Sequence, residues 1–281
     1  MGPLMAQTDL FRRPVVDPVG RAARILDVAI RRHKPVAVFA MFSGGHDSIC
    51  AAHVASRHPD FTACVHVNTG IGIEQTREYV RNICKDFGWP LLEYHALDHG
   101  QDYDEIVSKH GFPGPFAHTM MYIKLKERGI ASLIRDHKTQ RLDRVMLVTG
   151  VRRAESTRRM ATTQTINRDG ARVWVAPLVD WTGSTKKEYM REHDIPRNEV
   201  VDLLHMSGEC LCGAFAHPNE LEEIGIWFPE EYQRIKDLEA RASERGVPCV
   251  WGQAPPEEPM IDPQQQELPL CVACVNREGT L

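Results

Sequence analysis

One segment constrains this sequence more than any other: an uninterrupted apolar run followed at once by a loop with two adjacent glycines. Residues 35–42, PVAVFAMF, predict a short strand that is buried on both faces. The loop 42–48, FSGGHDS, comes next, and residues 49–58, ICAAHVASRH, predict a helix directly behind it. A buried strand that leads through a tight glycine loop into a helix is typical of a parallel α/β sheet.

The following residues repeat this alternation of strand and helix. Further helices are predicted at 21–33, 74–87, 118–137 (with a break at Gly129) and 185–194. Further strands are predicted at 62–68, 91–97 and 144–150, and a hairpin is predicted around Arg-Asp-Gly-Ala at 168–171. We therefore expect an α/β fold with a doubly wound, mostly parallel sheet of the Rossmann-like kind.

The chain divides by composition into three parts. Residues 1–20 are rich in proline and predict a loose N-terminal arm, and residues 21–196 predict the α/β domain that carries the glycine loop. Residues 197–281 predict a segment of helices and loops that carries five of the eight cysteines. With 281 residues, of which 42% are hydrophobic and 26% charged, the chain excludes global disorder and collagen-like architectures.

No stretch approaches the roughly 18 uncharged apolar residues of a membrane span, and the N-terminal residues lack a secretory apolar core. We therefore expect a cytoplasmic protein without a membrane partner. Cysteines in such a protein are more often buried, catalytic or metal-binding than paired in disulfides.

The loop between the first strand and its helix has the chemistry of an anion site. Gly44 and Gly45 permit backbone angles closed to other residues, and Ser43 and Ser48 add hydroxyl groups. The free N–H groups at the start of the following helix favour a phosphate or a sulfate. Asp47 does not favour a bare anion, so we expect it to orient a neighbour or to bind Mg²⁺. The Walker pattern and the GxGxxG pattern are both absent.

Four ordered motifs over roughly residues 35–200 carry a resemblance to a known family. SGGHDS at 43–48 resembles the SGGxDS signature of the PP-loop family, the adenine-nucleotide α-hydrolase-like enzymes. HVNTGIGIEQTREYV at 66–80, GVRRAESTRRM at 150–160 and APLVDWT at 176–182 resemble motifs of its branch that contains phosphoadenosine phosphosulfate (PAPS) reductases and related sulfur-transfer proteins.

The resemblance implies roles for particular residues. Those implied to bind the nucleotide or its phosphates are Ser43, Gly44, Gly45, His46, Asp47, Ser48, Val67, Asn68, Thr69, Gly70, Lys126, Gly150, Arg152, Arg158 and Arg159. Those implied to be catalytic are Asp47, Arg152, Glu155 and Arg159. Arginine suits an anion site because its planar fork makes bidentate hydrogen bonds to phosphate.

The sequence also departs from the PAPS reductase pattern. It has no C-terminal Glu-Cys-Gly-x-His segment, and the most similar sequence is Gly208-Glu209-Cys210-Leu211-Cys212-Gly213. His46 stands where the branch often has lysine, and Lys126 matches a lysine of the branch without the cysteine that often precedes it. These departures favour sulfur transfer slightly over ordinary reduction of PAPS.

The C-terminal cysteines form two close pairs, Cys210 with Cys212 and Cys271 with Cys274. Pairs of thiolates at such short spacing can hold one metal centre, and four thiolates admit a 4Fe-4S cluster or Zn²⁺. We expect these four cysteines to be metal ligands, with the iron–sulfur cluster preferred to zinc. Redox-active dithiols and inert thiols remain as alternatives.

Three functions remain open at this point. The first is α-phosphate activation by ATP with Mg²⁺, followed by sulfur transfer; the second is thiol-dependent reduction of adenylyl sulfate to sulfite. The third is a nucleotide-binding subunit of a nucleic-acid-modifying assembly, since residues 121–172 are rich in lysine and arginine. The partners expected are an adenine nucleotide, a sulfur donor or reductant protein, a nucleic-acid acceptor and a second copy of the chain.

Overall fold

The computed structural model describes residues 17–155, 163–247 and 249–252. One six-stranded sheet forms the centre, with the strand order β3-β2-β1-β4-β6-β5. The strands are β1 (Ala37–Met41), β2 (Phe61–Asn68), β3 (Leu91–His95), β4 (Val145–Val148), β5 (Ile166–Asp169) and β6 (Arg172–Val175). Five strands run parallel, and only the edge strand β5 is antiparallel to its neighbour. The expectation of a doubly wound, mostly parallel α/β sheet is confirmed.

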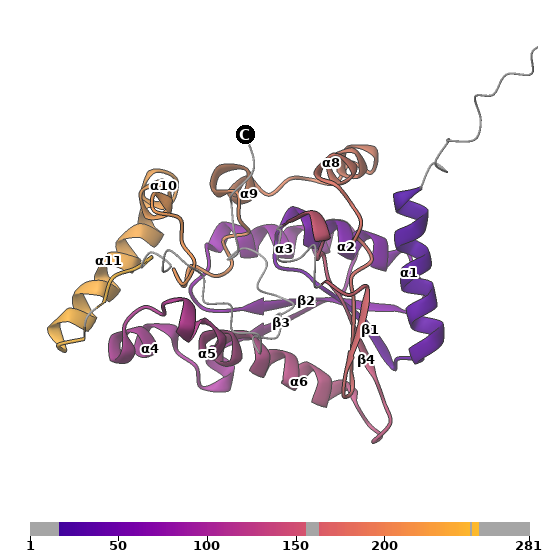
Figure 1. The fold of residues 1–281 in the computed structure, drawn as a ribbon, viewed down its shortest axis with the longest axis horizontal. Coiled ribbons are helices and arrows are strands. Elements are labelled where there is room, and N and C mark those ends of the chain that lie inside the picture. The colour runs from indigo at the N-terminus through magenta and orange to yellow at the C-terminus, as the bar shows by residue number, and fades with distance from the viewer. Residues whose placement is uncertain (1–16, 156–162, 248, 253–281) are drawn as a thin grey trace, which may run out of the picture.

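Helices cover both faces of this sheet (Figure 1). On one face lie α1 (Pro18–His33), α2 (His46–Ser56), α3 (Glu74–Asp86) and α8 (Gly183–Glu192). On the other face lies α6 (Arg128–His137). Side chains of β1 alternate between the two layers, since Val38 and Ala40 join the first core while Phe39 and Met41 join the second.

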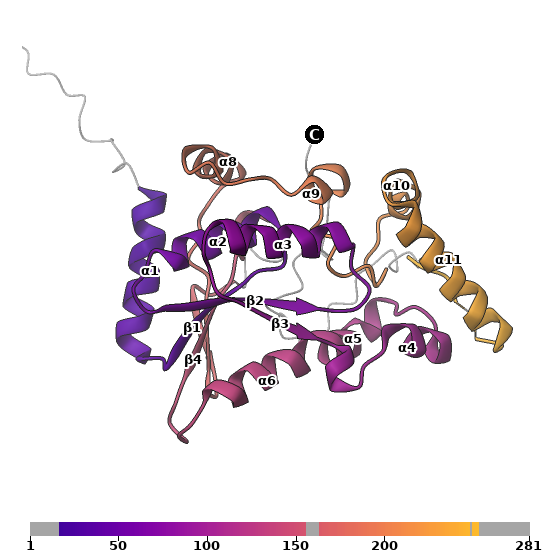
Figure 2. The ribbon, with the colours of Figure 1, turned by 180° about the vertical axis from the view of Figure 1, so that it is seen from behind.

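A third core lies beyond the sheet, where the C-terminal helices pack beside α4 and α5 (Figure 2). Its elements are α4 (Tyr103–His110), α5 (His118–Tyr122), α9 (Glu199–Leu204), α10 (Glu220–Trp227) and α11 (Pro229–Glu244). Loop residues 211–216, which include Cys212, belong to the same core. No helix in the described ranges is both long enough and apolar enough to cross a membrane.

The predicted elements differ from the structure in several places. The first helix begins at Pro18 rather than at residue 21, because Asp17 caps it and proline fits its first turn. The break expected at Gly129 is wrong: Gly129 lies inside α6 against Tyr94, and the irregularity is a π-helical turn, η3 (Ile123–Glu127). The helices α4 and α9 were not predicted, since each spans only eight residues or fewer.

The strand order places a change of direction between β1 and β4. From β1 the chain proceeds outward to β2 and β3, whereas β4, β6 and β5 lie on the other side. Parallel sheets bind ligands at the carboxyl ends of the strands where such a change occurs. The glycine loop that follows β1 and the arginine segment that follows β4 meet at this point.

Candidate functional site

The loop Ser43–Ser48 joins the end of β1 to the start of α2. Gly44 has a φ angle of 82°, a region that favours glycine, and Gly45 is the N-cap residue of α2. The Ser48 hydroxyl donates a hydrogen bond to the Gly45 carbonyl oxygen at 2.8 Å, and the Ser43 hydroxyl lies 3.3 Å from that of Ser48. The first N–H groups of α2 therefore stand at the carboxyl edge of the sheet, as the sequence predicts for an anion site.

Asn198, in the C-terminal segment, holds this loop by a hydrogen bond to its backbone. Its side-chain amide donates to the Gly44 carbonyl oxygen at 2.9 Å and to the Thr76 hydroxyl at 3.3 Å. Its side-chain oxygen accepts from the Val200 N–H at 3.0 Å and so caps α9. One buried side chain thus connects the loop after β1 with a helix that lies 150 residues further along the chain.

His46 is buried at the start of α2 and acts as a neutral acceptor. Burial, together with the smaller effect of the charge of Arg197, lowers the pKa of His46 to about 4. The ring atom Nε2 accepts a hydrogen bond from the Asn198 backbone N–H at 3.2 Å. At neutral pH this position therefore supplies no positive charge to the loop.

Asp47, in the first turn of α2, has a carboxylate that lies between two cations. Arg152 makes a bidentate contact with its carboxylate, at 2.6 Å and 3.1 Å, and the Lys186 ammonium lies 3.1 Å from the same group. Burial by itself raises the pKa of Asp47, but Lys186 and Arg152 outweigh it and hold that pKa below its usual value. Asp47 is therefore an ionised carboxylate that fixes two positive side chains.

Arg152 reaches Asp47 because the chain after β4 passes very close to the loop. A Cβ atom at Gly150 would lie 2.4 Å from the Asp47 carbonyl carbon, so only glycine fits there. The Arg152 guanidinium also donates to the Trp181 carbonyl oxygen, and its backbone N–H donates to the Glu155 carboxylate at 3.1 Å. The remaining predicted arginines, Arg158 and Arg159, lie outside the described residues.

The predicted nucleotide segment after β2 is mostly buried. Val67 packs into the core, Asn68 donates to Glu93 at 3.1 Å, and the Asn68 side-chain oxygen accepts from the Gly70 N–H at 3.0 Å. Gly70 is exposed. The Gly70 carbonyl oxygen accepts from Arg234 at 2.8 Å, so the polar backbone atoms of this exposed residue already have partners.

A buried ion network connects the same segment to the cysteine loop. The Glu209 carboxylate accepts from the Thr69 N–H at 2.9 Å, and it lies 3.0 Å from His66 Nε2 and 3.7 Å from Arg77 Nε. The Thr69 hydroxyl donates to the Glu209 carbonyl oxygen at 2.6 Å. Burial raises the pKa of Glu209, but the charges of His66 and Arg77 outweigh it and hold that pKa low. The carboxylate directly before Cys210 is thus ionised and fixed to the end of β2.

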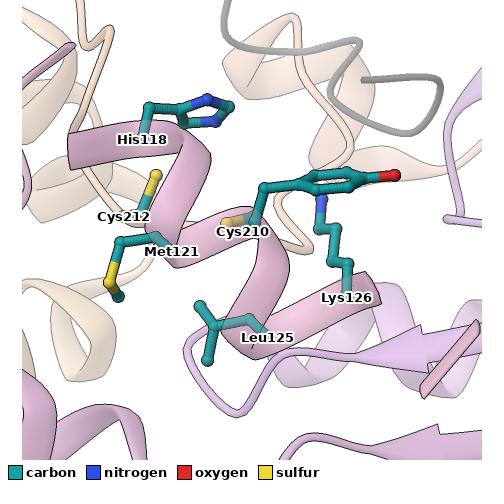
Figure 3. Close-up of a pocket in the computed structure, with 7 residues that line it drawn as sticks. His118, Met121, Leu125, Lys126, Cys210 and Cys212 are labelled. Atoms are coloured by element: carbon teal, nitrogen blue, oxygen red, sulfur yellow. The ribbon is translucent and has the colours of Figure 1, made fainter. Parts of the chain in front are cut away.

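Cys210 and Cys212 face one small pocket together with the side chain of Lys126, which comes from η3 (Figure 3). A hydrogen bond with Cys212 and burial raise the pKa of Cys210 well above its usual value, and Lys126 opposes them. The other lining residues are His118, Met121, Tyr122 and Leu125. The structure therefore brings together Cys210, Cys212 and Lys126, which the sequence placed in two separate sites.

Cys271 and Cys274, the other two predicted metal ligands, lie outside the described residues. Within the described ranges, no group of three or more His, Cys, Asp or Glu side chains is arranged to hold a metal ion. The prediction of a four-thiolate site stays a prediction, and the structure supplies two of its four thiols at one pocket.

Three residues of the site were missed by sequence reasoning. Lys186 lies outside all four motifs, and one lysine in a polar helix gives no signal of its own. Asn198 stands before the apolar pattern of α9 and matches an N-cap position, which was the available signal. Glu209 was quoted only as a neighbour of Cys210, because a single carboxylate does not indicate its burial.

The fold and the loop define an α/β protein of the PP-loop class. The chain belongs to the phosphoadenosine phosphosulfate reductase domain family, whose model matches residues 37–212. This match includes the glycine loop, the arginine segment and the Cys210–Cys212 pair.

Two curated relatives are similar in sequence. An uncharacterized protein of Methanocaldococcus jannaschii is 24% identical over 211 residues, which cover 74% of this chain and 48% of that protein. The chain thus spans about half the length of this relative. Phosphoadenosine 5′-phosphosulfate reductase of Xylella fastidiosa is 26% identical over 175 residues, covering 59% of this chain and 67% of that one.

Solved structures with similar folds are more distant. The PAPS reductase of Candida auris, in a phosphate complex, has a TM-score of 0.49 and 18% identity, covering 65% of this chain and 84% of that one. The FMN adenylyltransferase of Candida glabrata in complex with ATP has a TM-score of 0.47 and 11% identity, covering 66% and 58%. The U34-tRNA thiolase of Methanococcus maripaludis, with its 4Fe-4S cluster, has a TM-score of 0.45 and 14% identity, covering 80% and 79%.

Proposed function

We propose that the chain is an enzyme that binds ATP at the loop Ser43–Ser48 and activates an acceptor at the α-phosphate for sulfur transfer. The observation that carries the proposal is the cationic pair Arg152 and Lys186, held by Asp47 at the N-terminus of α2. Helix N–H groups, an arginine fork and an ammonium group together favour an oxyanion with several charges.

The proposed reaction has two steps. An oxygen of the acceptor attacks the α-phosphorus of ATP, the bond to the β-phosphate oxygen breaks, and pyrophosphate leaves. A sulfide sulfur then attacks the activated carbon of the acceptor, the carbon–oxygen bond breaks, and AMP leaves with that oxygen. Arg152 is suited to stabilise the negative charge that develops on the phosphate oxygens.

Of the two roles expected for Asp47, the contacts favour orientation of Arg152. Both of its carboxylate oxygens already accept from cations, so the group does not fit as a direct ligand of Mg²⁺. In our proposal Mg²⁺ arrives bound to the ATP phosphates.

The loop that carries the cysteine pocket is hydrogen-bonded to the carboxyl edge of the sheet, where we propose that the nucleotide binds. Ser207 accepts from Thr76 at 2.6 Å, and Glu209 is fixed to Thr69, so the chain from 207 to 210 crosses the carboxyl edge of β2. The paired thiols Cys210 and Cys212 fit half of a thiolate metal site, and we propose Cys271 and Cys274 as the other half. A 4Fe-4S cluster held there would supply a site for handling sulfur.

The test compares ATP with adenylyl sulfates on the full chain, purified without oxygen. One reaction holds ATP, Mg²⁺, sulfide and total RNA and is assayed for AMP and pyrophosphate; the other holds adenylyl sulfate or PAPS with a dithiol and is assayed for sulfite. We expect AMP and pyrophosphate, and we expect Arg152→Ala to lower their formation by at least ~100-fold. Arg153→Ala is the matched control, because Arg153 pairs with Asp180 at the surface.

Sulfite formation without use of ATP would overturn this proposal in favour of a reductase. Binding of nucleotide without turnover of either substrate would favour the third candidate, a nucleotide-binding subunit of a larger assembly. The basic segment 121–172 is the observation behind that candidate.

A further inference from the structure

Lys186 is a lysine on α8 whose side chain is largely buried at the glycine loop. Its ammonium lies 3.1 Å from the Asp47 carboxylate, and the side chain is only 16% exposed. The next residue, Lys187, is exposed on the same helix. The position of Lys186 is therefore set by the fold and differs from that of an ordinary surface lysine.

Asp47 is shared by two cations. Among the described ion pairs, Asp47 is the one carboxylate that Lys186 contacts, and it is also the carboxylate that Arg152 contacts. Arg152 has a second negative charge nearby, since the Glu155 carboxylate accepts from its backbone N–H and the charge of Glu155 raises the pKa of Arg152. Lysine has three N–H donors, so contact with Asp47 leaves donors for a second acceptor.

The positive charge of Lys186 acts on the glycine loop itself. Asp47 is in the first turn of α2, whose unpaired N–H groups carry partial positive charge. Besides burial and Arg197, the charge of Lys186 contributes to the lowered pKa of His46 in the same turn. A dianionic or more highly charged group at this loop would meet the helix N-terminus, Arg152 and Lys186 together.

Aromatic packing fixes the helix that carries Lys186. Tyr189, one turn further along α8, accepts or donates a hydrogen bond with His53 of α2 at 2.7 Å. The Tyr189 ring also packs edge-on against Trp181 at 4.8 Å between centroids. The backbone of α8 is thus anchored to α2, and the ammonium is held in place before any ligand binds.

We propose that Lys186 is a phosphate-binding residue that makes the site prefer ligands with a pyrophosphate group over monophosphates. This inference rests on the proposed function in that it assumes a nucleotide phosphate chain at the loop. Lys186 lies outside the four motifs that carry the family resemblance.

The experiment measures binding of inorganic pyrophosphate and of AMP to the full chain by isothermal titration calorimetry. We expect Lys186→Ala to weaken pyrophosphate binding by about 10-fold or more and AMP binding by less than about threefold. Lys186→Arg, which keeps the charge, is expected to recover most of the affinity, and Lys187→Ala is the matched control. The salt dependence of pyrophosphate binding is expected to decrease in Lys186→Ala alone.

Two results would overturn the inference. One is that Lys186→Ala binds pyrophosphate as tightly as Lys187→Ala does. The other is an equal loss for pyrophosphate and AMP, which would make Lys186 a structural partner of Asp47 only. Lys186→Met keeps the apolar stem and replaces the alanine variant if that variant does not fold. Because binding needs no turnover, a chain that binds pyrophosphate through Lys186 but forms no AMP from ATP would refute the proposed function and leave this inference intact.

Discussion

At the scale of single residues, the site depends on ionisable groups whose burial changes their charge or fixes it. His46 is neutral, whereas Glu209 and Asp47 stay ionised despite burial. The difference follows from their partners, since each carboxylate faces cations and the imidazole faces a backbone N–H.

The burial of His46 predicts a dependence of stability on pH. The pKa of His46 is about 4 in the folded protein and 6.5 in an unfolded chain, so between these values only the unfolded state binds the proton. The contribution of His46 to the free energy of unfolding is therefore fully present above pH 6.5. It is lost as pH falls towards 4, by about 1.4 kcal/mol per pH unit for this one group. Urea unfolding at several pH values from 4.5 to 6 gives the slope of the free energy of unfolding against pH. We expect this slope to correspond to about one proton fewer in His46→Gln than in the unsubstituted chain. An unchanged slope would show that His46 is already protonated in the folded state.

Glu209→Gln tests the network beside the cysteine pair. Loss of this buried charge leaves His66 and Arg77 without their shared partner, and we expect a loss of about 3 kcal/mol in the free energy of unfolding. We also expect alkylation of Cys210 to become several-fold faster, because the residue before it is no longer held by the charges of His66 and Arg77. Denaturant unfolding and mass spectrometry of alkylated peptides measure the two effects. Glu192→Gln, at the exposed end of α8, is the control, and equal alkylation rates in both variants would contradict the positioning role.

At the scale of elements, short connections at the carboxyl edge of the sheet determine which side chains come together in the site. The loop after β1, the segment after β4, Lys186 of α8 and the cap of α9 all meet there. Asn198 is the residue that serves two elements at once, since it caps α9 and donates to the Gly44 carbonyl oxygen.

A pair of variants separates the two tasks of Asn198. Asn198→Ser keeps a side-chain oxygen for the cap and loses the donor to Gly44, whereas Asn198→Ala loses both. We expect both variants to bind ATP several-fold more weakly, and the alanine variant to lose about 1 kcal/mol more stability than the serine variant. Calorimetric titration and thermal unfolding measure these effects. If the serine variant binds ATP as the unsubstituted chain does, the Gly44 contact is not needed for the loop.

At the scale of the whole molecule, three cores are joined around one edge of the sheet. Two cores lie on the faces of the sheet, and the third holds α4, α10, α11 and the loop with Cys212. The Glu209 network and Asn198 are two of the polar connections between this third core and the sheet.

The four-thiolate proposal predicts a metal content for the full chain. Protein purified without oxygen is expected to contain iron and sulfide and to absorb broadly near ~400 nm. Cys271→Ser and Cys210→Ser are each expected to lose most of the iron, while Cys249→Ser, in the same quarter of the chain, retains it. Metal and sulfide analysis with absorption spectra provides the measurement. Zinc without iron would make the site a structural one, and a protein with neither metal would favour a redox-active dithiol.

The sequence alone determined the sheet and the position of the glycine loop. Apolar runs of five to eight residues and the helical periodicity between them are local signals, so β1, β2, β4 and the hairpin β5–β6 were all predicted close to their observed bounds. The motif SGGHDS likewise indicated the turn, because its glycines act within one short loop, whereas the ligand class that it predicts stays a prediction.

Only the tertiary structure decided which side chains complete that site. Lys186, Asn198 and Glu209 each contact a residue more than 120 positions away, and no local pattern records such a contact. The same applies to Asp47, whose role depends on cations brought by β4 and α8. Burial and charge pairing arise when distant segments pack together, so the fold followed from periodicity whereas the electrostatics of the site followed from packing.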